Sequence, residues 1–296
     1  MNYIEQGHGA PLVLIPGLQG RWEYTRATVD ALSKDFRVIS FSLGDEPTAQ
    51  FPFEPGRGLD SYADQVGAAL EATNVPRAII CGVSFGGLIA LRYAAKHPQR
   101  VDALILASTP GPGWRLRPRH DLYARFPWIF GPMFLLEIPF RARHELEAAL
   151  PRREARHAFG RMMLGTLAKA PVSLTRMARR ARLIASYTVD DCIRDCTRIE
   201  APTLVVTGEA ALDHVVPVGG SSRYSELIAG ATRSVLERTG HQGTLTRPEA
   251  FTATVQTFVA GIASAQGDRP RAVTGAAALE AAPENDASKV RSGRVA

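Results

Sequence analysis

The residues with the clearest capacity for chemistry are a serine, an aspartate and a histidine that lie far apart in the chain. Ser84 stands between two glycines in the pattern Gly82-x-Ser84-x-Gly86, and Asp213 and His241 each follow a strand-like stretch nearer the C-terminus. A serine hydroxyl is a weak nucleophile and needs a base, which in turn is held by a third group. These residue types therefore indicate nucleophilic catalysis by a serine.

The segment around Ser84 predicts a strand, a tight turn and a helix. Residues 78–81 are continuously apolar, as in a buried strand, and residues 88–96 carry apolar side chains at helical spacing. A strand that turns into a helix at one serine needs small neighbours, because the two elements pass close together. Gly82 and Gly86 meet this need. The hydroxyl of Ser84 is then expected at a helix N-terminus, where backbone N–H groups favour negative charge.

Asp213 and His241 are each placed by a strand that precedes them. Strands are predicted at 204–207 and 232–237, and the loops that follow contain Asp213 and His241. Catalytic groups of open parallel sheets gather outside the carboxyl ends of the strands. Ser84 obeys the same rule, so we expect the three side chains at one edge of a sheet.

Other acids and histidines fit these roles less well. Glu209 and Asp45 are alternative acids, but Glu209 lies closer to the end of its strand. His214 is a loop neighbour of Asp213. The remaining histidines near helices are His97, His120, His144 and His157. None of them follows a late strand as His241 does.

The order of the elements predicts an α/β fold with a doubly wound, mostly parallel sheet. Strands and helices alternate up to Pro110, and the sheet resumes near 201. Between these points the chain is helix-like and without a convincing strand. We therefore expect a core of residues 1–113 and 186–264 and a helical cap of residues 114–185. Residues 265–296 contain hardly a large apolar side chain, and this composition predicts disorder.

The predicted cap carries both an apolar patch and the basic charge of the chain. Residues 126–136 are rich in aromatic and aliphatic side chains, which are expected either to face an apolar substrate or to pack the cap onto the core. Between Trp114 and Arg182, 14 Arg and 1 Lys stand against 5 acidic residues, whereas the whole chain has a net charge of +6. No nucleic-acid motif accompanies this charge. A solvated helical face, an acidic carrier protein or an anionic membrane surface all remain open as explanations.

Composition sets the broad class. Hydrophobic residues make up 45% and charged residues 22% of the chain, as in ordinary globular proteins. Three cysteines do not suggest a secreted disulfide framework, and the N-terminus lacks the character of a signal peptide. We expect a cytoplasmic protein without a metal or a cofactor.

These features together resemble the α/β-hydrolase superfamily over nearly all of residues 3–262. The chain order of serine, aspartate and histidine is that of the family. The matching motifs are Pro16-Gly17-Leu18, Gly82-x-Ser84-x-Gly86, Asp213-x-x-Val216-Pro217 and Gly240-His241. Two motifs depart from the usual pattern. Pro16 stands where many members have a histidine, and residues 42–46 replace a frequent Asp-x-x-Gly-x-Gly.

The resemblance implies a role for each motif residue. Ser84 is then the nucleophile, His241 the general base and acid, and Asp213 the group that orients His241. The backbone N–H groups of Leu18 and Phe85 form the oxyanion hole. The structural turns depend on Gly17, Gly82 and Gly86.

The function implied is that of a cofactor-independent serine hydrolase acting on a small or medium carboxylic ester through an acyl-enzyme. A serine at position 84 argues against epoxide hydrolases and haloalkane dehalogenases, which need a carboxylate nucleophile. Carbon–carbon bond hydrolases, thioesterases and esterases of acyl-carrier proteins use the same triad and stay open. A non-catalytic small-molecule-binding protein of the same fold is the alternative from another class.

Overall fold

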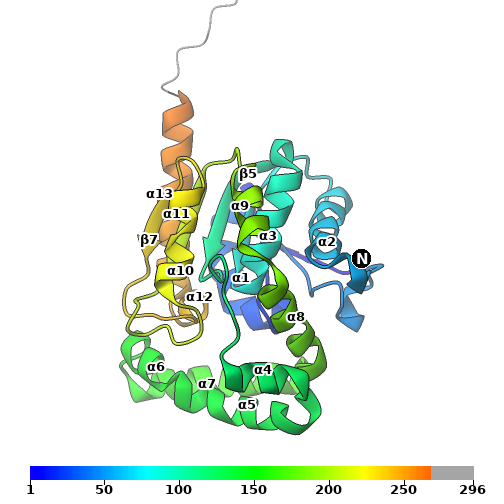
Figure 1. The fold of residues 1–296 in the computed structure, drawn as a ribbon. Coiled ribbons are helices and arrows are strands. Elements are labelled where there is room, and N and C mark those ends of the chain that lie inside the picture. The colour runs from blue at the N-terminus through cyan, green and yellow to red at the C-terminus, as the bar shows by residue number, and fades with distance from the viewer. Residues whose placement is uncertain (268–296) are drawn as a thin grey trace, which may run out of the picture.

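The computed structural model describes residues 1–267, and its centre is a seven-stranded sheet in the order β1-β3-β2-β4-β5-β6-β7 (Figure 1). Only β1 runs antiparallel to its neighbour; the other pairings are parallel. The strands are β1 Ile4–Gln6, β2 Ala10–Ile15, β3 Phe36–Ser40, β4 Ala78–Val83, β5 Val101–Ala107, β6 Thr203–Thr207 and β7 Thr232–Val235. The predicted fold class, α/β with a mostly parallel sheet, is confirmed.

Helices cover both faces of this sheet, which explains why its central strands are apolar without alternation. The α-helices are α1 Arg26–Leu32, α2 Leu59–Ala72, α3 Phe85–Lys96, α4 Pro118–Arg125, α5 Pro127–Arg141, α6 Arg143–Ala149, α7 Arg153–Lys169, α8 Leu174–Ser186, α9 Val189–Cys196, α10 Val218–Ser222, α11 Tyr224–Leu227, α12 Gly243–Thr246 and α13 Pro248–Gly267. One buried apolar cluster joins the sheet to α2, α3 and α9, and a second joins its other face to α1 and α13. The two clusters together form the core that holds the strand ends in place.

The segment between β6 and β7 forms two short helices, α10 and the one-turn α11, and not one continuous helix. The hydroxyl of Ser221 donates a hydrogen bond to the carbonyl of Thr109, and that of Tyr224 donates to the carbonyl of Pro110. These two hydrogen bonds to the residues after β5 fix the path of the segment. They join residues far apart in the sequence, so helical periodicity cannot predict them.

Helices α4 to α7 lie beyond the carboxyl ends of the strands, across the lower end of the molecule in Figure 1, and α8 leads from them back to the core. Part of the apolar patch predicted in this region is exposed: Trp128 keeps 81% and Leu136 71% of its accessible surface. The expectation that these side chains pack the cap onto the core is therefore wrong for both. Within residues 1–267, no helix is both long and apolar enough to cross a membrane. The tail predicted to be disordered comprises residues 265–296: residues 265–267 belong to α13, and the rest lies outside the described residues.

Candidate active site

Ser84 lies at the sharp turn between β4 and α3, as its glycine neighbours predict. Its backbone has φ 54° and ψ −117°, a strained conformation for a residue with a side chain. A Cβ atom on Gly82 would lie 2.2 Å from the carbonyl oxygen of Gly86, and one on Gly86 would lie 2.4 Å from that of Ile15. Larger residues at either position would push the strand and the helix apart. The strain at Ser84 is thus maintained by close packing on both sides of it.

His241 lies beside Ser84 although 157 residues separate them in the chain. Its Nε2 atom is 3.0 Å from the Oγ atom of Ser84, which is a hydrogen-bonding distance. Its Nδ1 atom is 3.4 Å from Oδ2 of Asp213. This second distance is long for a hydrogen bond, but such contacts often tighten only when substrate is bound. The structure therefore brings together the serine, histidine and aspartate that the sequence singled out.

The carboxylate of Asp213 is held in place by its own loop. Its Oδ1 atom accepts hydrogen bonds of 2.9 Å from the backbone N–H groups of Val215 and Val216, which leaves Oδ2 facing His241. Burial by itself would raise the pKa of Asp213. The hydrogen bond and charge of His241 and the two N–H donors outweigh burial and hold that pKa below its usual value. Asp213 is therefore ionised throughout the neutral pH range.

Two backbone donors are available next to Ser84. Phe85 begins α3, and the loop containing Leu18 passes close by, since a Cβ atom on Gly17 would lie 3.4 Å from the Cβ atom of Ser84. Neither the Phe85 nor the Leu18 N–H donates a hydrogen bond to any atom of residues 1–267. Both are thus free to bind a negatively charged oxygen, as the resemblance implies.

A buried arginine fixes the loop that contains Leu18, and the sequence reasoning missed it. Arg180 of α8 donates a 2.9 Å hydrogen bond to the carbonyl of Leu18. It also forms salt bridges with Asp45 at 2.5 Å and Glu46 at 2.6 Å. These acids belong to the segment that departs from the family pattern, after β3. This unusual segment could have indicated a basic partner, because two adjacent acids in the loop after a buried strand need a cation when they are buried.

Glu145 of α6 is the second residue that the sequence reasoning missed. Its side chain is buried, and Oε1 accepts a 2.6 Å hydrogen bond from the backbone N–H of Gln242, next to His241. Burial raises the pKa of Glu145, while the N–H groups of Gln242 and Gly240 and the nearby His241 counteract this only in part. A cap residue therefore anchors the loop that carries His241.

We expect Glu145→Ala to lower the free energy of unfolding by about 1–3 kcal/mol, because the N–H of Gln242 is left buried without an acceptor. Glu145→Gln keeps an acceptor oxygen and should lose less.

The folded state binds a proton at Glu145 more readily than the unfolded chain does, so this residue opposes folding increasingly as the pH rises through its raised pKa. Wild type should therefore gain stability relative to Glu145→Gln as the pH is lowered from about 8 to about 5. Urea titrations of the three proteins across this range test the expectation; a difference that does not change with pH would contradict it.

The rival residues lie elsewhere or have other partners. Glu209 accepts a 2.6 Å hydrogen bond from the backbone N–H of Arg238 and so links the loop of Asp213 to that of His241. His97 packs against Tyr93, and His120 lies 2.7 Å from a guanidinium nitrogen of Arg141. Each of them is accounted for without a role at Ser84.

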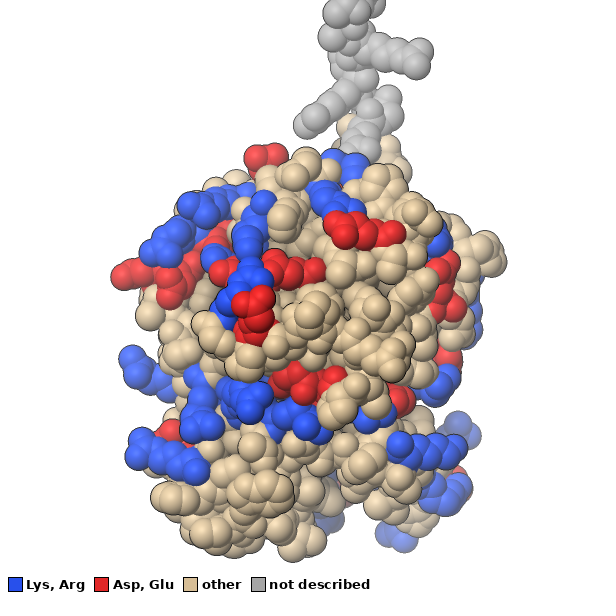
Figure 2. All heavy atoms as spheres, turned by 90° about the vertical axis from the view of Figure 1, so that its right-hand side faces the viewer, with Lys and Arg blue, Asp and Glu red and all other residues tan. Residues whose placement is uncertain are grey.

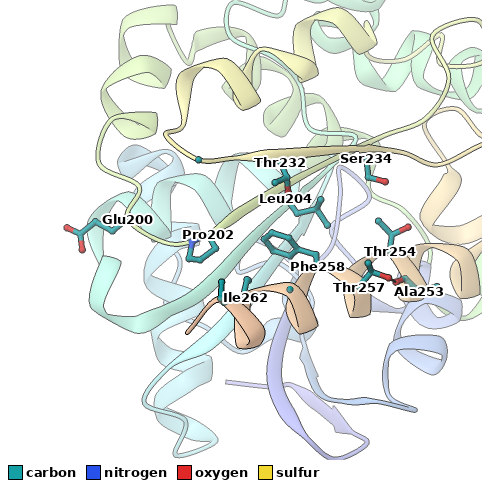
Figure 3. A pocket seen from close by; sticks show the side chains of 13 residues that line it. Glu200, Pro202, Leu204, Thr232, Ser234, Ala253, Thr254, Thr257, Phe258 and Ile262 are labelled. Carbon is teal, nitrogen blue, oxygen red and sulfur yellow. Dashed lines mark hydrogen bonds between the residues drawn. The ribbon is translucent and has the colours of Figure 1, made fainter. Parts of the chain in front are cut away.

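A cavity of about 940 Å³ opens between β6, β7 and α13 (Figure 3). Its walls include Leu204, Thr232 and Phe258, whose side chains Figure 3 shows around the space. Ser84, Asp213 and His241 are not among the described residues that line it. This cavity at the edge of the sheet is therefore separate from the candidate active site.

The chain is similar to known hydrolases over most of its length. RutD of Caulobacter sp. (strain K31), named as a carbamate hydrolase, is 28% identical over 87% of this chain and 95% of its own length. A 2-hydroxy-6-oxo-2,4-heptadienoate hydrolase of Pseudomonas putida is 26% identical over 88% of this chain and 92% of its own length. The solved esterase EaEST of Exiguobacterium antarcticum has the same fold, with a TM-score of 0.70 at 21% identity over 87% of this chain and 94% of the esterase.

A family model also matches most of the chain. The family is described as the alpha/beta hydrolase fold, and the match covers residues 10–248. It includes the turn at Ser84, the loop of Asp213 and His241. The chain therefore belongs to the α/β hydrolase family.

Proposed function

We propose that the protein is a serine hydrolase that cleaves a small or medium carboxylic ester through an acyl-enzyme. Ser84 Oγ attacks the carbonyl carbon while Nε2 of His241 accepts its proton. The N–H groups of Phe85 and Leu18 bind the oxyanion that forms. His241 then donates the proton to the departing alkoxide, which leaves the acyl group on Ser84. A water molecule, deprotonated by His241, attacks this acyl group and releases the acid and the free serine.

The observation that carries this proposal is the 3.0 Å contact between His241 Nε2 and Ser84 Oγ at a turn with φ 54°. A nucleophile and a base within hydrogen-bond reach, with the base oriented by a third group, is the arrangement that activates a serine. The two free backbone donors beside Ser84 supply the remaining part of the chemistry.

Labelling with a fluorophosphonate probe tests the proposal. We expect one covalent adduct per chain, with loss of esterase activity in proportion to labelling. Mass spectrometry should find the adduct on Ser84. Ser108 is a matched internal control, because it follows β5 and also has a positive φ, of 46°, but no histidine partner in the described chain. An unmodified wild-type protein would favour the alternative of a non-catalytic binding protein.

Cleavage of a carbon–carbon bond is the second candidate, and the Pseudomonas putida relative favours it. The same serine, base and oxyanion donors serve both reactions, so the substrate decides between them. We suggest measuring kcat/KM for p-nitrophenyl esters and thioesters of graded chain length beside 2-hydroxy-6-oxo-2,4-heptadienoate. A preference for the dienoate over the best ester by about tenfold, or 1.4 kcal/mol of transition-state binding, would assign the protein to the second reaction.

A further inference from the structure

Helix α5 exposes an apolar stripe that nothing in the described chain covers. Residues 129, 133, 136 and 140 follow one another at intervals of three or four and so share one face of the helix. Phe140 keeps 81% of its accessible surface, as does Trp128 beside the stripe. The exposed large apolar residues of this region are Leu122, Phe126, Trp128, Ile129, Met133, Leu136, Ile138 and Phe140 on α4 and α5, with Met162, Leu164 and Leu167 on α7. An exposed apolar stripe like that of α5 marks an interaction site.

Cationic side chains surround this apolar surface. Figure 2 shows Lys and Arg side chains in a belt across the lower part of the molecule, above a mostly uncharged surface, with further Lys and Arg side chains at its lower right edge. Several cations between residues 114 and 182 have no acidic partner: Arg115, Arg117, Arg152, Arg153, Arg161 and Lys169 form no salt bridge with residues 1–267. The cap therefore presents free positive charge next to exposed apolar groups.

A small cavity brings the two features together. It has a volume of about 340 Å³ and is lined by Arg117, Arg119, His120, Glu137, Phe140 and Arg141. Three guanidinium groups thus stand against one carboxylate, which is paired with Arg119. Burial and the charges of Arg141, Arg117 and Arg119 lower the pKa of His120 to about 4, as expected where positive charge is in excess. A site with this donor set suits a phosphate oxygen.

We propose that the apolar stripe of α5 and the arginines around it form a docking surface for a lipid bilayer that carries anionic headgroups. The stripe enters the boundary between headgroups and acyl chains, and the arginines bind the phosphates. A second copy of the chain is a poorer occupant, because a two-fold contact would set the same arginines against one another. An acidic carrier protein would neutralise the arginines but would leave the aromatic side chains without an apolar partner.

This orientation would place the active site near the membrane. The cap lies beyond the strand ends that carry Ser84 and His241, and α13 ends on the opposite side of the molecule (Figure 1). Glu145 and Arg180 connect the cap to the loops of His241 and Leu18. A protein bound through α5 would therefore hold Ser84 on its membrane side, close to esters that dissolve in lipid.

Sedimentation with vesicles tests the proposal on the full-length protein. We expect binding to vesicles of phosphatidylcholine mixed with phosphatidylglycerol at low salt. Binding should be at least about tenfold weaker to phosphatidylcholine alone or at high salt, because salt screens the arginines. Free inorganic phosphate at millimolar concentration should not displace the protein, since the stripe supplies part of the affinity. Absence of binding to the anionic vesicles, or complete displacement by phosphate, would overturn the proposal.

Matched variants separate the two parts of the surface. Arg115→Ala with Arg117→Ala should weaken binding about fivefold for each arginine removed. Trp128→Ser with Leu136→Ser should weaken it at least as much. Val235→Ser with Arg233→Ala, which removes exposed residues of the same kinds from β7, should leave binding unchanged. All three double variants should hydrolyse a water-soluble ester at the wild-type rate, so a failure of lipid binding is distinguishable from a failure of the proposed hydrolase function.

Fluorescence and self-association provide a second readout. Wild-type emission should shift to shorter wavelength on anionic vesicles, whereas Trp128→Phe should still bind but lose most of this shift. If Trp128→Ser with Leu136→Ser instead abolishes a dimer seen by analytical ultracentrifugation and leaves vesicle binding intact, the stripe is an interface between copies and the lipid proposal is wrong.

Discussion

Replacing Asp213 by asparagine is expected to lower kcat on a soluble ester by about 10⁴-fold while the protein still folds. Asparagine keeps the Oδ1 atom that accepts the N–H groups of Val215 and Val216, so the loop retains its anchors. The second oxygen, 3.4 Å from Nδ1 of His241, becomes an NH₂ group. This group cannot accept a hydrogen bond from Nδ1–H and donates one to Nδ1 instead, so the proton of the neutral imidazole lies on Nε2, which can then no longer accept the proton of Ser84. Steady-state kinetics with a melting curve measures both effects.

Glu209→Gln is the matched control for Asp213→Asn. Glu209 is the nearest rival acid, and its carboxylate accepts a hydrogen bond from the backbone N–H of Arg238. Glutamine retains this acceptor, so kcat should stay within about threefold of wild type, a change in barrier below 1 kcal/mol. If Asp213→Asn keeps more than a tenth of the activity while Glu209→Gln loses it, Glu209 orients the base and the assignment of Asp213 is wrong.

The sequence predicted the residues at the strand ends because local rules place them. Ser84 and Asp213 follow the buried strands β4 and β6, His241 follows the exposed edge strand β7, and parallel strands bring their carboxyl ends to one edge. The same argument does not predict the roles of Glu145 or Arg180. Both lie on cap helices, and what they contact depends on how those helices stack, which no local pattern encodes.

Helical periodicity was misleading in the cap for a physical reason. Met177, Ala181 and Ile184 form the buried face of α8, and Arg180 lies among them. From the sequence pattern, an arginine on the buried face of a helix is unexpected. Its burial is explained by its salt bridges with Asp45 and Glu46, which lie far away in the sequence. In α5 the opposite occurs: apolar residues at regular spacing predict burial, yet the structure exposes them. In both helices the helical spacing alone therefore gives the wrong burial, because burial here depends on contacts between distant segments of the chain.

Arg180→Met is expected to lower the free energy of unfolding by about 3–5 kcal/mol. The side chains of Arg180, Asp45 and Glu46 are at most 1% exposed, so removal of the cation leaves two buried carboxylates side by side. Burial would lower the pKa of Arg180, but the two acids outweigh this effect and raise it, which keeps the guanidinium charged. Arg176 still contacts Glu46 at 3.0 Å and limits the loss. Urea titration at neutral pH measures the change.

A triple variant separates two effects of Arg180: its pairing with the charges of Asp45 and Glu46, and its effect on catalysis. Arg180→Met combined with Asp45→Asn and Glu46→Gln removes all three charges, and we expect it to recover much of the lost stability. It should not recover kcat, because the carbonyl of Leu18 still lacks the 2.9 Å hydrogen bond from Arg180. The Leu18 N–H would then be poorly aligned with the oxyanion, which costs up to about 10²-fold in kcat. If stability and kcat recover together, Arg180 acts only through the stability of the fold; if stability recovers and kcat does not, it positions the oxyanion donor.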